Sequence, residues 1–400
     1  GRNVMQGGSR RSAIYASLNW QHEDIEAFLR VKNWQNYNIG KSGYTLKQAK
    51  QDDFNFPAPL DMTNISLNWD DAWLNQPQRD RNAVFVENCR QAMSTGEPGF
   101  SFNFGDTQNE TLRNACTEVT SEDDSDVCNL GSVNLGNIES LEELRDVVAL
   151  ASKFLVCGTL RADLPYQKVH EVREKNRRLG LGLMGIHEWL LKRGYKYEVT
   201  EELHKWLAVY KKQSVAASNE HCDRLFISHP VAYRAIAPTG TIGILAGTTT
   251  GIEPVFAVAY KRRYLTDGTK WKYELCVDST ADVLIKGGVD PKKMETAYTL
   301  SEHYDQRIKF QADVQDYVDM SISSTINMPP WGTDKNCEAK VASFAKVLSQ
   351  YAPRLRGFTC YPDGSRGGQP ITEIDYKDAI GHKGIVYEEN SECANGVCGV

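Results

Sequence analysis

Two short segments carry side chains that could perform chemistry together. The first is Asn114-Ala115-Cys116-Thr117-Glu118, and the second begins twelve residues after the thiol, at Cys128. In an extended chain alternate side chains project from one face, so an amide, a sulfur and a carboxylate would meet the same patch of substrate. The carboxylate could act as a general base, and a second thiol makes disulfide chemistry conceivable. The simpler alternative is that Cys116 and Cys128 are small buried hydrophobic residues, as free cysteines usually are.

A loop rich in threonine and glycine could hold an anion. Its residues follow the apolar run 232–237 and are Pro238, Thr239, Gly240, Thr241 and Ile242. Glycines let backbone N–H groups converge and threonine hydroxyls add donors, so such a loop can bind phosphate without a lysine. The segment matches neither GxxxxGK[ST] nor GxGxxG. A tight structural turn would explain the same residues.

The last twelve residues contain two more cysteines, Cys393 and Cys398, among small and polar neighbours. Two thiols cannot complete a zinc site without two further ligands. We therefore expect residues 389–400 to form a mobile tail whose thiols exchange with disulfides elsewhere in the protein. The alternative is that both are incidental tail cysteines.

A glycine-rich segment, 178–187, could be mistaken for a dinucleotide-binding loop. The helical apolar pattern on both sides of it favours close packing of helices instead. His187 is interpreted as a structural, hydrogen-bonding histidine. No group of His, Glu and Asp residues has convincing metal-ligand spacing, so no metal site is predicted.

Composition indicates a soluble globular protein. The chain has 400 residues and a formal charge of −6, and it contains no apolar run near the roughly 20 residues that span a bilayer. The acidic balance argues against broad binding of nucleic acid or anionic membranes. The ten cysteines are spread along the chain, which suits a reducing cytoplasm. Gly1 is not a start methionine, so the sequence is expected to begin inside a longer protein.

Helical periodicity alternates with short apolar or β-branched runs. Helices are predicted at 22–32, 81–93, 141–154, 167–178, 201–224, 306–322 and 337–351. Strands are predicted at 12–18, 100–104, 232–237 and 358–361, and loops at 55–80 and 329–336. This alternation favours an α/β layered or barrel architecture.

Taken in order, the motifs resemble the catalytic subunit of a ribonucleotide reductase. The resemblance rests on Asn-Ala-Cys-Thr-Glu, Cys-Asn-Leu-Gly-Ser-Val-Asn-Leu, Pro-Thr-Gly-Thr-Ile with Gly-Ile-Glu-Pro, and the terminal Cys-x4-Cys. It extends to residues 7–13, 96–100 and 324–329, and so covers nearly the whole chain. The fold it implies is a ten-stranded α/β barrel with the radical cysteine on a finger loop through its centre. Residues 1–388 would form part of this barrel, with the first strands outside the chain.

The resemblance implies a role for each residue of the site. Cys116 resembles the thiyl-radical cysteine that removes the ribose 3′ hydrogen, and Glu118 the carboxylate that takes the 3′-hydroxyl proton. Asn114 resembles the amide that hydrogen-bonds the hydroxyl side of the substrate. Cys128 resembles one of the two thiols that reduce the 2′ position, and residues 238–242 resemble the loop that holds the substrate phosphates.

The resemblance also implies how the site is re-reduced. Cys393 and Cys398 resemble the shuttle pair that reduces the internal disulfide and then exchanges with thioredoxin or glutaredoxin. In the family, the partner of the Cys128-like thiol lies upstream of the segment that matches residues 1–12, and no other cysteine here has a matching context. We therefore expect the isolated chain to be inactive, and measurable ribonucleotide reduction by it would contradict this.

The resemblance leaves two possible sources for the radical: adenosylcobalamin, or a separate metal-containing subunit. Residues 238–242, 260–263 and 359–366 look most like the adenosylcobalamin-dependent class II type. The class that uses a separate metal-containing subunit usually has two adjacent tyrosines where Cys360 precedes Tyr361 here. We therefore favour adenosylcobalamin as the cofactor, with a radical-generating small subunit as the alternative. A non-catalytic nucleotide-binding module is an alternative of a different class.

The resemblance further implies the surroundings in which the protein works. The substrate would be a ribonucleoside di- or triphosphate, and a homodimer is among the assemblies it leaves open. A phage origin is also left open. The location would be the cytoplasm, or the host cytoplasm for a viral protein.

Overall fold

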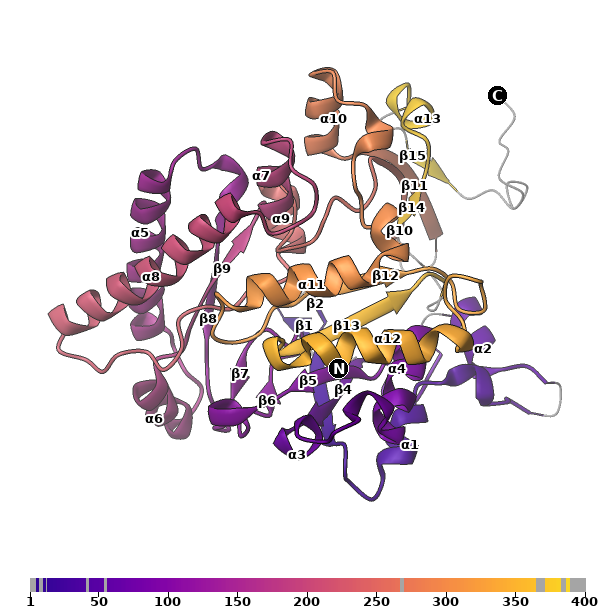
Figure 1. The fold of residues 1–400 in the computed structure, drawn as a ribbon, viewed down its shortest axis with the longest axis horizontal. Coiled ribbons are helices and arrows are strands. Elements are labelled where there is room, and N and C mark those ends of the chain that lie inside the picture. The colour runs from indigo at the N-terminus through magenta and orange to yellow at the C-terminus, as the bar shows by residue number, and fades with distance from the viewer. Residues whose placement is uncertain are drawn as a thin grey trace.

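The structure is a computed structural model, and it describes residues 5–6, 10–11, 13–40, 43–53, 56–266, 270–364, 371–382 and 386–388. Its helices and strands alternate along much of the chain, as predicted (Figure 1). Within these residues no helix is both long enough and apolar enough to cross a membrane.

The central sheet consists of two sets of parallel strands. In the first set β3 (Ile14–Asn19), β4 (Thr63–Trp69) and β5 (Gly99–Phe102) run parallel. In the second set β12 (Thr325–Met328) and β13 (Gly357–Pro362) run parallel. The two sets meet where β13 pairs antiparallel with β5, which gives the order β12-β13-β5-β4-β3.

Two more parallel strands extend the second set: β8 (Asn129–Asn134) and β9 (Leu179–Met184). Segment 233–236 lies between β9 and the chain that leads into β12, and isolated parallel bridges join it to both: Leu181 with Arg234, and Ile236 with Ile322. Two sets of parallel strands that run antiparallel to each other where they meet match the part of an α/β barrel that was predicted. No pairing between β3 and β8 closes the ring in the part of the chain that the structure describes.

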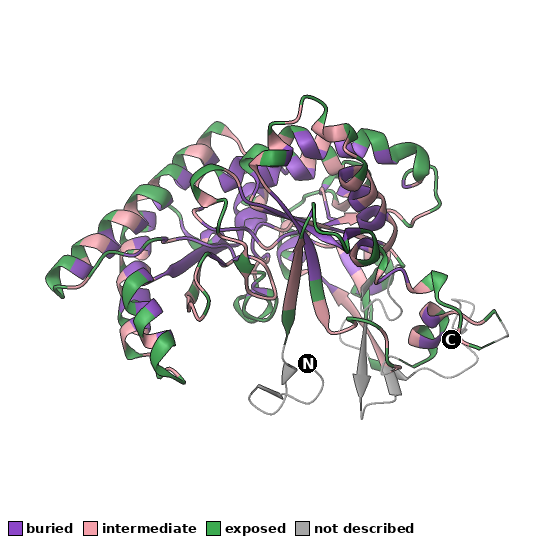
Figure 2. Ribbon diagram, turned by 90° about the horizontal axis from the view of Figure 1, so that it is seen from below, coloured by how far each residue is buried: buried purple, intermediate pink, exposed green. Residues whose placement is uncertain are grey.

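Helices cover the sheet on its outer side, and buried residues concentrate in the strands and on the inner helix faces (Figure 2). The longer helices are α4 (Ala83–Thr95), α5 (Leu141–Arg161), α6 (Gln167–Asn176), α8 (Glu201–Arg224), α11 (Tyr304–Gln315) and α12 (Glu338–Tyr351). The shorter ones are α1 (Ile25–Arg30), α2 (Leu46–Asp52), α3 (Asp71–Leu74), α7 (Ile186–Lys192), α9 (Gly240–Ala246), α10 (Ser279–Lys286) and α13 (Tyr376–Ile380).

Smaller sheets lie beside the central one. A four-stranded antiparallel sheet has the order β14-β10-β11-β15 and consists of Ile371–Glu373, Ala259–Thr266, Lys270–Val277 and Val386–Glu388. Two further pairs are β1 (Met5–Gln6) with β2 (Arg10–Arg11), and β6 (Leu112–Arg113) with β7 (Thr120–Ser121).

Most of the predicted elements are confirmed, three are wrong, and the helix predicted at 306–322 ends at Gln315 of α11. Helix α8 has the predicted bounds, whereas the predicted loop 55–80 contains β4. The predicted strand 232–237 forms only isolated bridges. The glycines of 178–187 lie in strand β9, where the predicted helix packing is wrong because Gly180 and Gly182 instead let neighbouring strands approach closely.

Candidate active site

Cys116 lies in the turn of a short hairpin. Strands β6 and β7 pair antiparallel, and residues 114–119 connect them. Thr117 has φ of 67°, and its N–H donates to the carbonyl of Asn114 at 3.0 Å. The left-handed backbone at Thr117 reverses the chain, so the extended geometry considered for this segment is wrong. The hairpin corresponds to the predicted finger loop.

Charged side chains fix the base of the hairpin. Glu110 lies between Arg356, at 2.7 Å, and Arg178, at 3.5 Å, and accepts a hydrogen bond from Thr120 of β7 at 2.6 Å. Burial alone would raise the pKa of the Glu110 carboxyl, but the hydrogen bonds from Thr120 and Arg356 hold it below its ordinary value. Arg178 also binds Asp126 at 2.9 Å, which ties the base to the residues before β8.

Glu118 is a buried carboxylate with an unused oxygen. Its side chain is 2% exposed, and its Oε2 has no hydrogen-bond partner among the described residues. Burial raises the pKa of Glu118, and a hydrogen bond from Asn114 partly opposes this. The backbone carbonyl of Glu118 accepts from the N–H of Ser321 at 2.8 Å, which joins the hairpin to the chain that leads into β12.

Cys128 lies directly before β8 and faces the hairpin. Burial raises its pKa to about 12, the positive charge of Arg178 opposes this, and the Glu118 carboxylate is close enough to add to it. Cys128 and Asn114 line the same cavity of about 420 Å³. A Cβ at Gly180 of β9 would lie 3.0 Å from the Cys128 sulfur, so the glycine makes room for the thiol. The structure therefore brings Asn114, Glu118 and Cys128 together.

Cys116 itself is partly exposed. The carbonyl of Ala115, directly before it, accepts a hydrogen bond from Asn64 of β4 at 2.6 Å. Asn64 lies within the segment that was predicted to be a loop, so sequence reasoning missed it. The alternating apolar residues of β4 (Ile65, Leu67 and Trp69) were the signal that could have found the strand.

The threonine–glycine loop follows segment 233–236, which forms isolated bridges in place of the predicted strand. Thr239 has φ of 52°, and α9 begins at the next residue. The Thr239 hydroxyl accepts from the N–H of Gly251 at 2.8 Å, which closes the loop. The Ser321 carbonyl accepts from the N–H of Ile236 at 3.2 Å, two residues before Pro238. The backbone of Ser321 therefore contacts both the hairpin, at Glu118, and the segment that leads into this loop, at Ile236.

His187 has the structural role that was predicted. Its Nδ1 accepts a hydrogen bond from the N–H of Val255 at 2.8 Å. Complete burial lowers its pKa to about 3, and the charge of Arg307 adds to this, so the ring stays neutral. No group of three or more His, Cys, Asp and Glu residues suited to a metal ion occurs in the described ranges.

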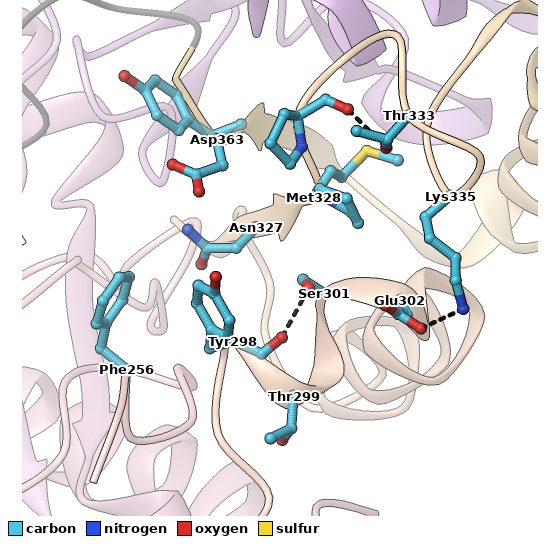
Figure 3. Close-up of a pocket in the computed structure, with 13 residues that line it drawn as sticks. Phe256, Tyr298, Thr299, Ser301, Glu302, Asn327, Met328, Thr333, Lys335 and Asp363 are labelled. Atoms are coloured by element: carbon cyan, nitrogen blue, oxygen red, sulfur yellow. Dashed lines mark hydrogen bonds and ion pairs between the residues drawn. The ribbon is translucent and has the colours of Figure 1, made fainter. Parts of the chain in front are cut away.

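A second cavity, of about 390 Å³, lies where β12 and β13 end (Figure 3). Asn327 and Tyr361 are register partners on these strands, and Tyr298 and Asp363 lie beside them. Lys335 and Glu302 form an ion pair of 2.7 Å at this cavity. Sequence reasoning missed the cavity, because its lining comes from segments far apart in the chain, and the motifs at 324–329 and 359–366 were read separately and not as neighbours. Cys393 and Cys398, the predicted shuttle pair, lie outside the described residues.

Comparison with known proteins identifies the family of this chain. The family described as ribonucleotide reductase, barrel domain, matches residues 79–224 and 231–352. The chain belongs to this family. The predicted resemblance and the α/β fold class are thereby confirmed.

Relatives of this reductase-family chain are longer than it is. A protein of Mycobacterium phage D29 named for adenosylcobalamin-dependent ribonucleoside-triphosphate reduction is 27% identical, over 99% of this chain and 61% of its own length. A vitamin B12-dependent ribonucleoside-diphosphate reductase of Mycobacterium tuberculosis (strain CDC 1551) is 26% identical, over 99% of this chain and 62% of its own length. The chain thus spans about three fifths of these curated relatives.

Solved structures share the fold of this reductase-family chain. The crystal structure of a B12-dependent (class II) ribonucleotide reductase matches with a TM-score of 0.65 at 19% identity, over 84% of this chain and 51% of that one. A class Id ribonucleotide reductase alpha subunit from Actinobacillus ureae matches with a TM-score of 0.59 at 15% identity, over 89% of this chain and 72% of that one.

Proposed function

We propose that the protein carrying this chain reduces ribonucleotides to 2′-deoxyribonucleotides through a thiyl radical on Cys116. The observation that supports this most is the Oε2 atom of Glu118, which is buried without a partner beside Cys128 and near the tip of the hairpin. An unsatisfied buried carboxylate oxygen costs free energy, and sites that retain such a group are commonly functional. A substrate hydroxyl would supply the missing hydrogen bond.

In the proposed reaction each residue has one task. The Cys116 radical removes the hydrogen atom from the 3′ carbon, and Glu118 accepts the proton of the 3′ hydroxyl while Asn114 hydrogen-bonds the substrate. The 2′ hydroxyl leaves as water with a proton from a thiol, and Cys128 with a second thiol supplies the two electrons and becomes a disulfide. Cys116 then returns the hydrogen atom to the 3′ carbon, which regenerates its radical, and Glu118 returns the proton to the 3′ oxygen. A pKa of about 12 keeps Cys128 in the protonated form that can donate hydrogen. Residues 238–242 would hold the phosphates.

Adenosylcobalamin is the cofactor we propose, since the relatives from the phage and from Mycobacterium tuberculosis are named for it. When bound, it supplies a carbon-centred radical that can remove the hydrogen of a thiol. Cys116 fits this requirement because its side chain is partly exposed at the tip of the hairpin and not sealed in a core. The chain's own part is to hold that thiol in place and keep it reduced.

Replacement of Cys116 tests the proposed activity. In the full protein that carries this chain, Cys116→Ser should lower ribonucleotide reduction by about 10³-fold or more, because a serine hydroxyl does not form the radical that the cysteine thiol forms. Cys157→Ser is the matched control, because Cys157 is an exposed thiol on α5 that hydrogen-bonds His221. Unchanged function in Cys116→Ser would instead support a non-catalytic nucleotide-binding module.

The radical source needs a separate experiment. Activity of the full protein with adenosylcobalamin alone would support the proposed cofactor. Strict dependence on a second, metal-containing subunit would contradict it and favour the alternative.

We further propose that Cys393 and Cys398 pass electrons from thioredoxin or glutaredoxin to the Cys128 disulfide, in the cytoplasm. A double Cys393→Ser, Cys398→Ser variant should then lose turnover with thioredoxin but keep it with dithiothreitol, which can reduce the internal disulfide directly. Equal losses with both reductants would contradict the shuttle role.

A further inference from the structure

We propose that Asn64 is a positioning residue for the Cys116 thiol and that the buried Lys32–Glu97 ion pair holds Asn64 in place. Asn64 lies near the start of β4, and its Nδ2 donates to the Ala115 carbonyl at 2.6 Å. That carbonyl belongs to the peptide group that joins Ala115 to Cys116. The bond therefore sets the plane from which the Cys116 side chain departs. The inference rests on the proposed function of Cys116.

The backbone on both sides of Asn64 is tied to one ion pair. The Lys32 ammonium donates to the carbonyl of Thr63 and binds Glu97 Oε2 at 2.7 Å. Glu97 Oε1 accepts from the N–H of Ile65 at 3.1 Å. Lys32 and Glu97 are 9% and 8% exposed, so these charge-assisted bonds compete little with water. Asn64 thus projects from a backbone that is fixed at the residue before it and the residue after it.

The hairpin needs such an external contact. Only two residue pairs hold β6 to β7, and isolated two-stranded hairpins are at best marginally stable. Ion pairs fix its base at Glu110, and the Ser321 N–H holds the carbonyl of Glu118 after the turn. Asn64 supplies a contact from the sheet at the tip itself, 51 residues away in sequence. A hydrogen bond of ordinary strength changes the population of a conformation by about 2- to 10-fold.

The same strand offers a second asparagine as a control, which is buried where Asn64 is exposed. Asn68 also lies on β4, and residues 64 and 68 point to the same face because side chains alternate along a strand. The Asn68 Nδ2 donates at 3.0 Å to Ser17 of the neighbouring strand β3, and not to the hairpin. Aspartate has the shape of asparagine but no N–H donor. Asn68→Asp keeps a partner in the Ser17 hydroxyl, whereas Asn64→Asp sets an acceptor against the Ala115 carbonyl.

Thiol alkylation tests the inference without turnover. The rate at which iodoacetamide modifies Cys116 is measured by peptide mass spectrometry, with the exposed Cys157 as internal reference. In the full protein, Asn64→Asp should change the Cys116-to-Cys157 rate ratio by about 3- to 10-fold, with an unchanged melting temperature. Asn68→Asp should leave the ratio within about twofold. Equal ratios in Asn64→Asp and Asn68→Asp would overturn the inference.

Steady-state kinetics separates this inference from the proposed function. With an active wild type, Asn64→Asp should lower kcat by about tenfold and leave KM within about twofold, because the radical thiol and not the phosphate loop is displaced. A fall in kcat no larger than that of Asn68→Asp would count against Asn64. A wild type that reduces no ribonucleotide would overturn the proposed function, while the alkylation ratio would still decide the role of Asn64.

Discussion

At the scale of single residues, Glu118 combines properties that do not favour stability. It is a carboxylate inside the protein, one of its oxygens lacks a partner among the described residues, and burial raises its pKa. Hydrogen bonds from the Asn114 side chain and from its own backbone N–H oppose this only in part. Such a group is retained where its chemistry is needed, since a neutral side chain of the same size would fit the site at lower cost.

Replacement of Glu118 by glutamine should therefore separate stability from activity. A raised folded-state pKa means that the stability linked to Glu118 is fully present at low pH and is lost as the pH rises through that pKa. Glu118→Gln should thus unfold like the wild type near pH 4 and be more stable by about 0.5–2 kcal/mol near pH 7.5. Urea unfolding at both pH values measures this. Ribonucleotide reduction by the variant should be lost. A free energy of unfolding that is the same for variant and wild type at both pH values would contradict the argument that a buried charge at Glu118 lowers stability.

At the scale of elements, strand β9 determines how closely the site can pack. A Cβ at Gly182 would lie 2.5 Å from the carbonyl oxygen of Ala235, and one at Gly180 would lie 2.4 Å from the side chain of Leu130. The absence of side chains at these two positions lets segment 233–236 and β8 lie against β9. One of these neighbours leads into the threonine–glycine loop, and the other begins beside Cys128.

Gly182→Ala should consequently loosen the sheet at the site. The nearest atom belongs to the backbone and cannot rotate away, so the strands must separate. We expect the free energy of unfolding to fall by about 1–3 kcal/mol, measured by chemical denaturation. Gly381→Ala is the control, because a Cβ there would meet nothing within 4 Å. An equal effect of the two substitutions would contradict the close approach of β9 to segment 233–236.

At the scale of the whole molecule, α11 joins two hydrophobic cores. The first core lies around β8, β9, α5 and α8 and includes Phe310 and Val314 of this helix. The second lies around β4, β5, β13, α4 and α12 and includes Ile308 and Ala312. Residues two positions apart point to different sides of a helix, so one helix buries side chains in both cores. The ring of Phe310 stacks on Tyr197 at 4.0 Å.

Phe310→Ala should destabilise both cores together. Loss of a fully buried phenylalanine costs about 3–5 kcal/mol through lost burial and the cavity left behind. Because α11 is shared, Trp189 in the first core and Trp73 in the second should report one common unfolding transition. Single-tryptophan variants that retain either indole would measure this. Separate transitions, with only the Trp189 signal shifted, would show that the two cores unfold independently.

Sequence alone determined the residue types of the site, the order of its motifs, most of the helices and the family. These follow from local patterns: periodicity placed α8, and the Asn114–Glu118 and Cys128 motifs stand out in the printed chain. Only the tertiary structure decided that residues 114–118 turn at Thr117, that β9 is a strand, and that Glu118 is buried with an unused oxygen. It also brought Asn64 to Ala115. Burial, pKa and hydrogen-bond partners depend on neighbours from distant parts of the chain, and no local pattern contains them.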